Sequence, residues 1–216
     1  AVGYTALREN TTGAQCSAFG VNALRSHTTG TYNSAFGYNA MRAASGATYH
    51  NAAFGASALF TLTTGDNNSA FGSTSLYALT TGGNNTAVGY EALQTNTTGV
   101  NNSAIGYQAL DSCTTGGYNH CQGDSSLGGV TTGTVNTAMG HHTGTSITTG
   151  TFNTCIGANA GRAGYSPFVP STESFRVVIG ANTVTNAYVK VAWTVTSDQR
   201  DKADITNFTH GLDYVN

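Results

Sequence analysis

Carboxylates, the commonest acid–base groups of hydrolases, are few and scattered in this chain. Residues 1–160 contain Glu9, Asp66, Glu91, Asp111 and Asp124. A glycosidase needs two carboxyl groups on either side of one bond. These residues fall at different positions of a sequence repeat, so no two of them are stacked as a pair. We therefore predict that the repeats contain no substrate-cleaving enzyme and bind no cofactor.

His141 and His142, with His120 nearby in the sequence, form the one candidate metal cluster. An inward histidine on a three-fold axis would supply a ring of three ligands. Adjacent residues of a strand face opposite sides, so at most one of the pair could join such a ring. We therefore interpret these histidines as surface residues of a corner and predict no metal site.

Four cysteines are present, Cys16, Cys113, Cys121 and Cys155, without the spacing of a zinc motif. Cys121 and Cys155 share a repeat position but lie two repeats apart, which is farther than a disulfide can bridge. The sequence therefore predicts four free thiols that act as small buried apolar side chains.

Ser197 and Lys202 lie in a charged stretch near the end of the sequence. A serine hydroxyl becomes a nucleophile beside a base, and a lysine can act as that base when burial lowers its pKa. The alternative is that Ser197 caps a turn and Lys202 is solvated. The residue types alone do not decide between these two interpretations.

Composition excludes several function classes. Only 8% of the residues are charged, the net charge is −2, and the eight lysines and arginines do not cluster, which argues against nucleic-acid binding. No apolar run approaches the ~20 residues of a membrane span, so we predict no membrane insertion. Aromatic residues make up 10% of the chain and recur with the glycines, which favours an ordered, β-rich protein.

The elements that would position these residues recur at a fixed spacing. Ten glycines mark the repeat, 17 positions apart except for one interval of 18 after Gly37: Gly3, Gly20, Gly37, Gly55, Gly72, Gly89, Gly106, Gly123, Gly140 and Gly157. We call the residues at one position of successive repeats a column. A fixed period of this kind indicates one structural unit copied along an axis.

Each repeat reads as two short extended pieces and two corners. An Asn-Ser-Ala-Phe-Gly strand leads to a bend at the glycine, a second strand carries Ala-Leu, and Thr-Thr-Gly forms the other corner. The sequence therefore predicts an all-β fold, a parallel β-roll or β-solenoid of about ten 17-residue turns over residues 1–160. The asparagine column before the glycine predicts either an amide ladder along the stack or left-handed corner residues.

Two neighbouring columns of the first strand are both apolar. Alanine stands two residues before the glycine, and Phe, Val, Ile or Met stands one residue before it. Because these neighbours point to opposite faces, and a thin solenoid has one interior, the second face must be covered by another chain. We therefore expect an obligate oligomer whose axis runs along the stack.

The period fails after Gly157. We predict an inserted loop at 161–176, which holds both prolines, final strands of the stack at 177–196, and the start of a new domain at 197–216. The sequence begins in the middle of a repeat, at Ala1, and stops soon after the new domain begins. We therefore expect further protein on both sides.

Residues 197–216 resemble the opening of the endosialidase-type intramolecular chaperone domain found at the C-terminus of phage tail fibres and tailspikes. The resemblance rests on Ser-Asp-x-Arg-x-Lys-x-x-Ile at 197–205 and Gly-Leu-Asp at 211–213. It implies a homotrimeric shaft and self-cleavage just before Ser197, with Ser197 as nucleophile and Lys202 as its base. Beyond this self-cleavage, no enzyme activity is expected.

The repeats are similar to those in tail fibres of marine and cyanobacterial phages, through strings such as Asn-Thr-Ala-Val-Gly-Tyr-Glu-Ala-Leu at 85–93. They also resemble the β-roll heads of trimeric autotransporter adhesins. The first resemblance implies a structural subunit of a trimeric tail fibre, extracellular on the virion, that helps to attach to a host-cell receptor. The alternative is an adhesin head, which would be marked by a membrane-anchoring barrel beyond Asn216.

Two exposed columns suggest binding. Tyr4, Tyr38, Tyr90 and Tyr107 each follow a repeat glycine and could form an aromatic stripe that stacks on the sugar rings of a receptor glycan, or could be packing at the rim. Threonine columns also occur in ice-binding solenoids, which need two outward threonines per turn. Thr11 and Thr12 are adjacent, so only one column should face out, which disfavours that class.

Overall fold

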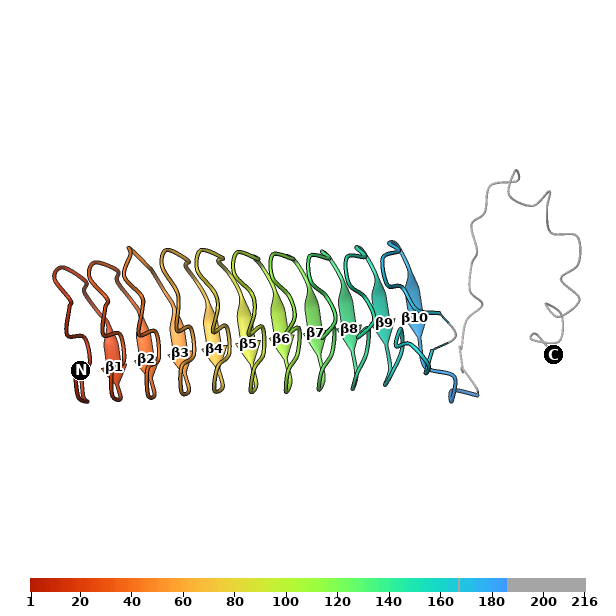
Figure 1. Cartoon of the computed structure of the whole chain (residues 1–216), viewed down its shortest axis with the longest axis horizontal. Helices are drawn as coiled ribbons and strands as arrows, with labels where there is room; N and C mark the ends of the chain where they lie inside the picture. Colours follow the sequence, from red (N-terminus) through yellow and green to blue (C-terminus); the bar gives the residue numbers. More distant parts are fainter. Residues whose placement is uncertain (167, 186–216) are drawn as a thin grey trace, which may run out of the picture. The chain divides into compact units, whose positions relative to one another are not determined.

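The structure is a computed structural model that describes residues 1–166 and 168–185. The chain divides into two units, Ala1–Val184 and Thr185–Asn216. The first unit is a parallel β-solenoid with about 17 residues per turn (Figure 1), which confirms the predicted fold class at this level. The predicted chaperone segment 197–216, and residues 186–196 of the predicted final strands, lie outside the described residues.

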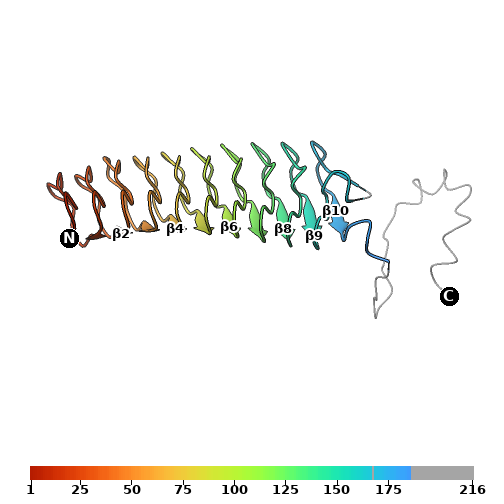
Figure 2. The ribbon, with the colours of Figure 1, turned by 60° about the horizontal axis from the view of Figure 1, so that its bottom comes forward.

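Each turn contributes one strand of three residues. The strands are β1 (Ser17–Phe19), β2 (Ser34–Phe36), β3 (Ala52–Phe54), β4 (Ser69–Phe71), β5 (Thr86–Val88), β6 (Ser103–Ile105), β7 (His120–Gln122), β8 (Thr137–Met139), β9 (Thr154–Ile156) and β10 (Val177–Ile179). They form one parallel sheet in sequence order. Figure 2 shows the strands aligned along one side of the stack. The described residues contain no helix, and so none that could cross a membrane.

Identical residues are stacked because the register never slips. Ala18 pairs with Ala35 across 17 positions, and Ala35 pairs with Ala53 across the longer repeat. The extra residue of that repeat is absorbed in the corner between Ser45, still 17 residues from its partner Thr28, and Asn51, which is 18 residues from Asn33.

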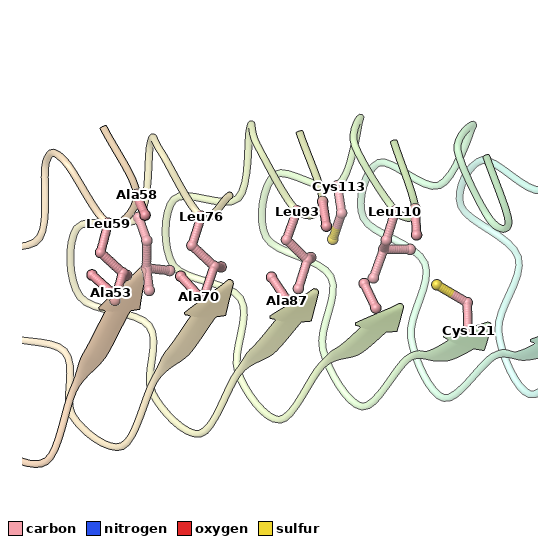
Figure 3. Packing of buried hydrophobic residues seen from close by; sticks show 14 of the residues in the cluster. Ala53, Ala58, Leu59, Ala70, Leu76, Ala87, Leu93, Leu110, Cys113 and Cys121 are labelled. Carbon is pink, nitrogen blue, oxygen red and sulfur yellow. The ribbon is translucent and has the colours of Figure 1, made fainter. Parts of the chain in front are cut away.

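The core is a narrow double row of alanines and leucines. The strand alanines point inward and are fully buried, and the leucines four residues after each repeat glycine are buried with them. In Figure 3, Ala53, Ala70 and Ala87 on the strands face the row that contains Leu76 and Leu93. Small residues on the sheet therefore leave room for large residues from the opposite side of the turn, and some turns bury two of them, such as Leu76 and Leu79.

The predicted second strand is wrong among the described residues. The Ala-Leu segment is a turn, in which Ala23 and Leu24 are adjacent and both fully buried. A strand would point them to opposite faces, but Leu24 has φ 50°, in the left-handed region, which turns it to the same side as Ala23. This backbone costs about 1–2 kcal/mol for a residue with a Cβ. Burying a leucine contributes about 1.5–3 kcal/mol and offsets that cost.

The asparagine column forms the amide ladder, one of its two predicted interpretations. Asn102 donates from its backbone N–H (3.0 Å) and from Nδ2 (3.2 Å) to Oδ1 of Asn85 in the preceding turn. Its Nδ2 also donates to the Gly116 carbonyl at 2.8 Å. The left-handed corner position belongs instead to the preceding residue, Asn101, with φ 56°. The ladder thus satisfies buried polar groups and fixes the register.

The repeat glycine is required by the close approach of consecutive turns. Gly20 has φ 132°, and a Cβ added there would lie 2.5 Å from the carbonyl oxygen of Gly37 in the next turn. No side chain fits in that space, because the atoms it would meet belong to the backbone of the next turn and cannot move aside. The 17-residue glycine period is therefore the period of turn-to-turn packing.

Each threonine pair divides its roles. The first threonine donates its hydroxyl to the next turn, as Thr80 Oγ1 does to the Thr97 carbonyl at 3.0 Å. The second, such as Thr81 or Thr98, is exposed. In these inner turns the second threonine is the more exposed of the pair, as predicted, whereas Thr11 and Thr12 of the first turn are both exposed.

The insertion after β9 keeps the contacts of the corner that it replaces. Cys155 of β9 pairs with Val178 of β10 across this longer connection. The Ser171 carbonyl accepts the Thr148 N–H at 2.8 Å, as a threonine carbonyl does in other turns. The sheet therefore continues through β10 despite the insertion.

Candidate functional site

The outer face of the sheet carries an apolar stripe, as predicted, with one polar interruption at β7. We define the apolar stripe as the apolar residue before each repeat glycine except Gly123, together with its equivalent in β10: Val2, Phe19, Phe36, Phe54, Phe71, Val88, Ile105, Met139, Ile156 and Ile179. Their alanine neighbours are fully buried, whereas Phe71, Ile105 and Met139 are 41%, 41% and 51% exposed. Each strand except β7 therefore presents one apolar residue to the core and one to the outside.

The aromatic part of the stripe is a ladder of its own. The rings of Phe19, Phe36, Phe54 and Phe71 are stacked nearly parallel, with centroids 4.7–4.9 Å apart. Each ring thus covers one face of its neighbour and leaves its outer edge to solvent. The result is a flat apolar ridge with no pocket for a small molecule, suited to packing against another extended apolar surface.

Strand β7 interrupts the stripe with polar side chains. Gln122 stands at the stripe position, and His120, two residues earlier, also faces outward, while Cys121 between them is buried. Shallow hollows in the sheet surface lie around His120 and are open to solvent. This is the one described strand whose stripe residue is polar.

The tyrosine column is exposed but not continuous. Tyr4 is separated from Tyr38 by the turn of Val21, whereas Tyr90 and Tyr107 lie in consecutive turns and stack with ring centroids 5.5 Å apart. The structure therefore brings two of the four predicted residues together. A role of the four tyrosines in glycan binding stays a prediction.

A polar pair lies beside the stacked tyrosines. Gln108 Nε2 donates to Glu91 Oε2 at 2.7 Å, one turn apart. This hydrogen bond, followed by one from Tyr90, lowers the pKa of Glu91, and the same carboxylate raises the pKa of Tyr90. Aromatic rings beside fixed polar groups are the usual materials of a carbohydrate-binding surface.

The histidine geometry corrects the argument made from strand alternation. His141 and His142 lie in the turn after Gly140, where His142 has φ 51°. Their ring centroids are 4.0 Å apart, and one ligand atom from each lies within 4.8 Å of the other and of a carboxylate oxygen of Asp124. His120 lies in β7 and is not a member of this cluster.

The surroundings of His142 disfavour its charged form. Burial is the largest cause that lowers the pKa of His142, followed by the charges of His141 and Arg162, while Asp124 acts in the opposite direction. Arg162 is held by Asn159 Oδ1 at 2.8 Å and lies over the ring of Tyr165. A sequence signal for this geometry existed: Asn22, Asn39 and Asn159, residues that tolerate left-handed backbone, occupy the column of His142.

The cysteine prediction is confirmed for three of the four thiols. All four are free, and Cys113, Cys121 and Cys155 are buried. Burial raises the pKa of Cys121 to about 12 and that of Cys113 to about 11. Cys16 stands in the asparagine column and is only half-buried, with Sγ 3.4 Å from Nε2 of His27.

Ser197 and Lys202 lie outside the described residues, so their pairing stays a prediction. Comparisons with protein-family models, with curated proteins and with solved structures gave no significant match. The function must therefore be inferred from the surfaces of the solenoid and from the sequence that follows it.

Proposed function

We propose that this chain is a structural subunit of a trimeric phage tail fibre, a distal shaft segment that takes part in host attachment. The observation that carries the proposal is the apolar stripe. It runs along the sheet on the face opposite the core, interrupted at Gln122, in a protein whose charged fraction is only 8%. An apolar strip of this length on a soluble protein marks a surface that meets another protein.

In the proposed assembly three copies pack in parallel around an axis along the stack. A closed ring of identical chains places each stripe residue beside its own copies, so phenylalanines meet phenylalanines and Gln122 meets Gln122. The copies keep the same register because all of them share one repeat period. The Ser and Thr column two residues earlier forms the polar rim of that contact.

The sequence after the described residues supports the fibre over the adhesin head. The Ser-Asp-x-Arg-x-Lys-x-x-Ile stretch resembles a chaperone domain that trimerises a shaft and then removes itself. In this proposal the Ser197 hydroxyl attacks the carbonyl carbon of Thr196, and Lys202 accepts the hydroxyl proton and passes it to the departing Ser197 amine as the peptide C–N bond breaks. Water then hydrolyses the resulting ester, so that the mature fibre ends at Thr196. The exposed tyrosines, with Tyr90 and Tyr107 as the stacked pair, contact the host receptor.

Mass analysis of the full-length gene product tests the maturation step. The wild-type protein should yield a shaft that ends before Ser197 and a separate C-terminal fragment, while Ser197→Ala should stay intact. Identical intact masses for both proteins would remove self-cleavage from the proposal.

Electron microscopy tests the fibre itself. Antibodies against residues 1–184 should label a thin appendage on virus particles that carry the gene and should block adsorption to the host. Labelling of a bacterial cell surface in the absence of virus would instead identify an adhesin.

A further inference from the structure

Asp124, His141 and His142 meet at the surface of two consecutive turns. Each turn passes its repeat glycine, Gly123 or Gly140, and then bends away from the sheet. Asp124 and His141 share a column, and His142 follows with its left-handed backbone. Its N–H donates to the Asp124 carbonyl at 2.8 Å, which locks the two turns in register. The donor atoms of all three side chains consequently lie within 4.8 Å of one another.

The donor set is that of a first-row transition ion. Zn²⁺ binds imidazole nitrogen and carboxylate oxygen at about 2.0–2.2 Å, which places tetrahedral ligands about 3.4 Å apart. From their greatest separation of 4.8 Å, the three donor atoms must therefore close by up to about 1.4 Å. Asp124 and His141 are exposed, so rotation of these side chains can supply that movement.

Hydrogen bonding already holds the carboxylate in place. Ser125 donates its hydroxyl to Asp124 Oδ1 at 2.7 Å, which leaves the second carboxylate oxygen for an ion. Such outer partners orient a ligand before the metal arrives. Arg162 is the one unfavourable neighbour, because its charge acts on His142. Its guanidinium is engaged by Asn159 Oδ1 at 2.8 Å and lies over the ring of Tyr165.

We propose that Asp124, His141 and His142 form a binding site for one divalent transition ion of the Zn²⁺ class, which links the turns of β7 and β8. Two nitrogens and one oxygen come from the protein, and water completes the coordination. The site lies within one chain and requires no partner copy. Ion binding at this site therefore does not depend on whether the chain forms the proposed trimer.

Titration of the full chain with ZnCl₂ tests the site, with calorimetry and dialysis as readouts. The wild-type protein should bind one Zn²⁺ per chain, and His142→Asn should weaken binding by more than about tenfold, the scale typical even for loss of an outer partner. Asparagine is native to this column and to its left-handed backbone at Asn22 and Asn159, so the variant should keep the fold.

His50→Asn is the matched control. His50 also has a left-handed backbone, with φ 57°, and its column contains Asn67 in the next turn, but it lies outside the cluster. This variant should bind Zn²⁺ like the wild type. Asp124→Asn is a second cluster variant and should also lose binding, while Arg162→Gln should tighten it.

Co²⁺ absorption reports the coordination directly. The visible d–d bands of nitrogen- and oxygen-bound Co²⁺ should develop with wild-type protein and with His50→Asn, and should be absent with His142→Asn. The proposal is overturned if the wild type binds no stoichiometric ion. It is equally overturned if His142→Asn and His50→Asn weaken binding alike, because the ion would then be shared among surface histidines.

Discussion

Replacing Ile105 by glutamine should dissociate the proposed trimer without unfolding the chain. Ile105 is 41% exposed in a single chain, and glutamine is already present in the same column, at Gln122, so the backbone accepts it. Two-fifths of the accessible surface of an isoleucine residue is roughly 75 Å². At about 25 cal/mol per Å², burial of this surface by partner chains contributes about 2 kcal/mol per chain. A trimer contains three copies, which gives about 6 kcal/mol.

A loss of about 6 kcal/mol corresponds to roughly a 10⁴-fold weaker trimer, since 1.4 kcal/mol is a factor of ten. Sedimentation equilibrium over a dilution series measures this shift, and circular dichroism checks that the β signal of the single chain persists. Thr98→Gln is the control, because Thr98 is exposed in the corner column and lies outside the stripe.

The expected outcome is an Ile105→Gln protein that becomes monomeric at concentrations where the wild type and Thr98→Gln stay trimeric. The reverse change, Gln122→Ile, should strengthen the trimer. A wild-type chain that is a folded monomer in dilute buffer, or an Ile105→Gln trimer as tight as the wild type, would refute the assignment of the stripe.

Two further perturbations act within the single chain. Asn102→Ala should lower the free energy of unfolding by about 2–4 kcal/mol, because it leaves the buried Asn119 N–H without its acceptor and the Gly116 carbonyl with only the weak thiol donor of Cys113; urea unfolding measures this, and a change below about 1 kcal/mol would contradict the ladder. The buried thiols lead us to expect that the folded state loses stability at alkaline pH. Burial raises the pKa of Cys121 to about 12, so the folded state keeps its proton after the unfolded state has lost it, and stability should fall as the pH rises from about 9 towards 12. Cys121→Ala, which matches Ala138 in the same column, should flatten that fall in urea midpoints, and an unchanged slope would exclude the thiol as its cause.

Most of the fold could be predicted from the repeat period of the sequence. A glycine at the same place in every repeat, with alanine and a larger apolar residue before it, predicted the strand, its register and its two apolar faces. These features follow from strand alternation and from stacking, which residue type and spacing report directly. The asparagine column left two interpretations open, an amide ladder and a left-handed corner residue. The structure shows the ladder, and the left-handed backbone belongs to the residue before the ladder asparagine.

The half of the turn after the glycine was not predictable in the same way. A leucine in the sequence does not predict a left-handed backbone, because that conformation costs a residue with a Cβ about 1–2 kcal/mol. Burial of Leu24 beside Ala23 overrides that preference, and burial depends on the whole stack. The same departure from alternation brings His141 and His142 together. The one sequence signal for this left-handed backbone was the column that contains Asn22 and Asn39.

The uninterrupted register has a mechanical consequence. Because the strand hydrogen bonds and the asparagine ladder join one turn to the next, tension along the stack would load the junctions in series, like links in a chain. The weakest junction then sets the force at which the solenoid opens. Cys16 places a thiol where the other turns offer an amide oxygen, so rupture should begin between the turns of Cys16 and Asn33 and leave the later turns wound.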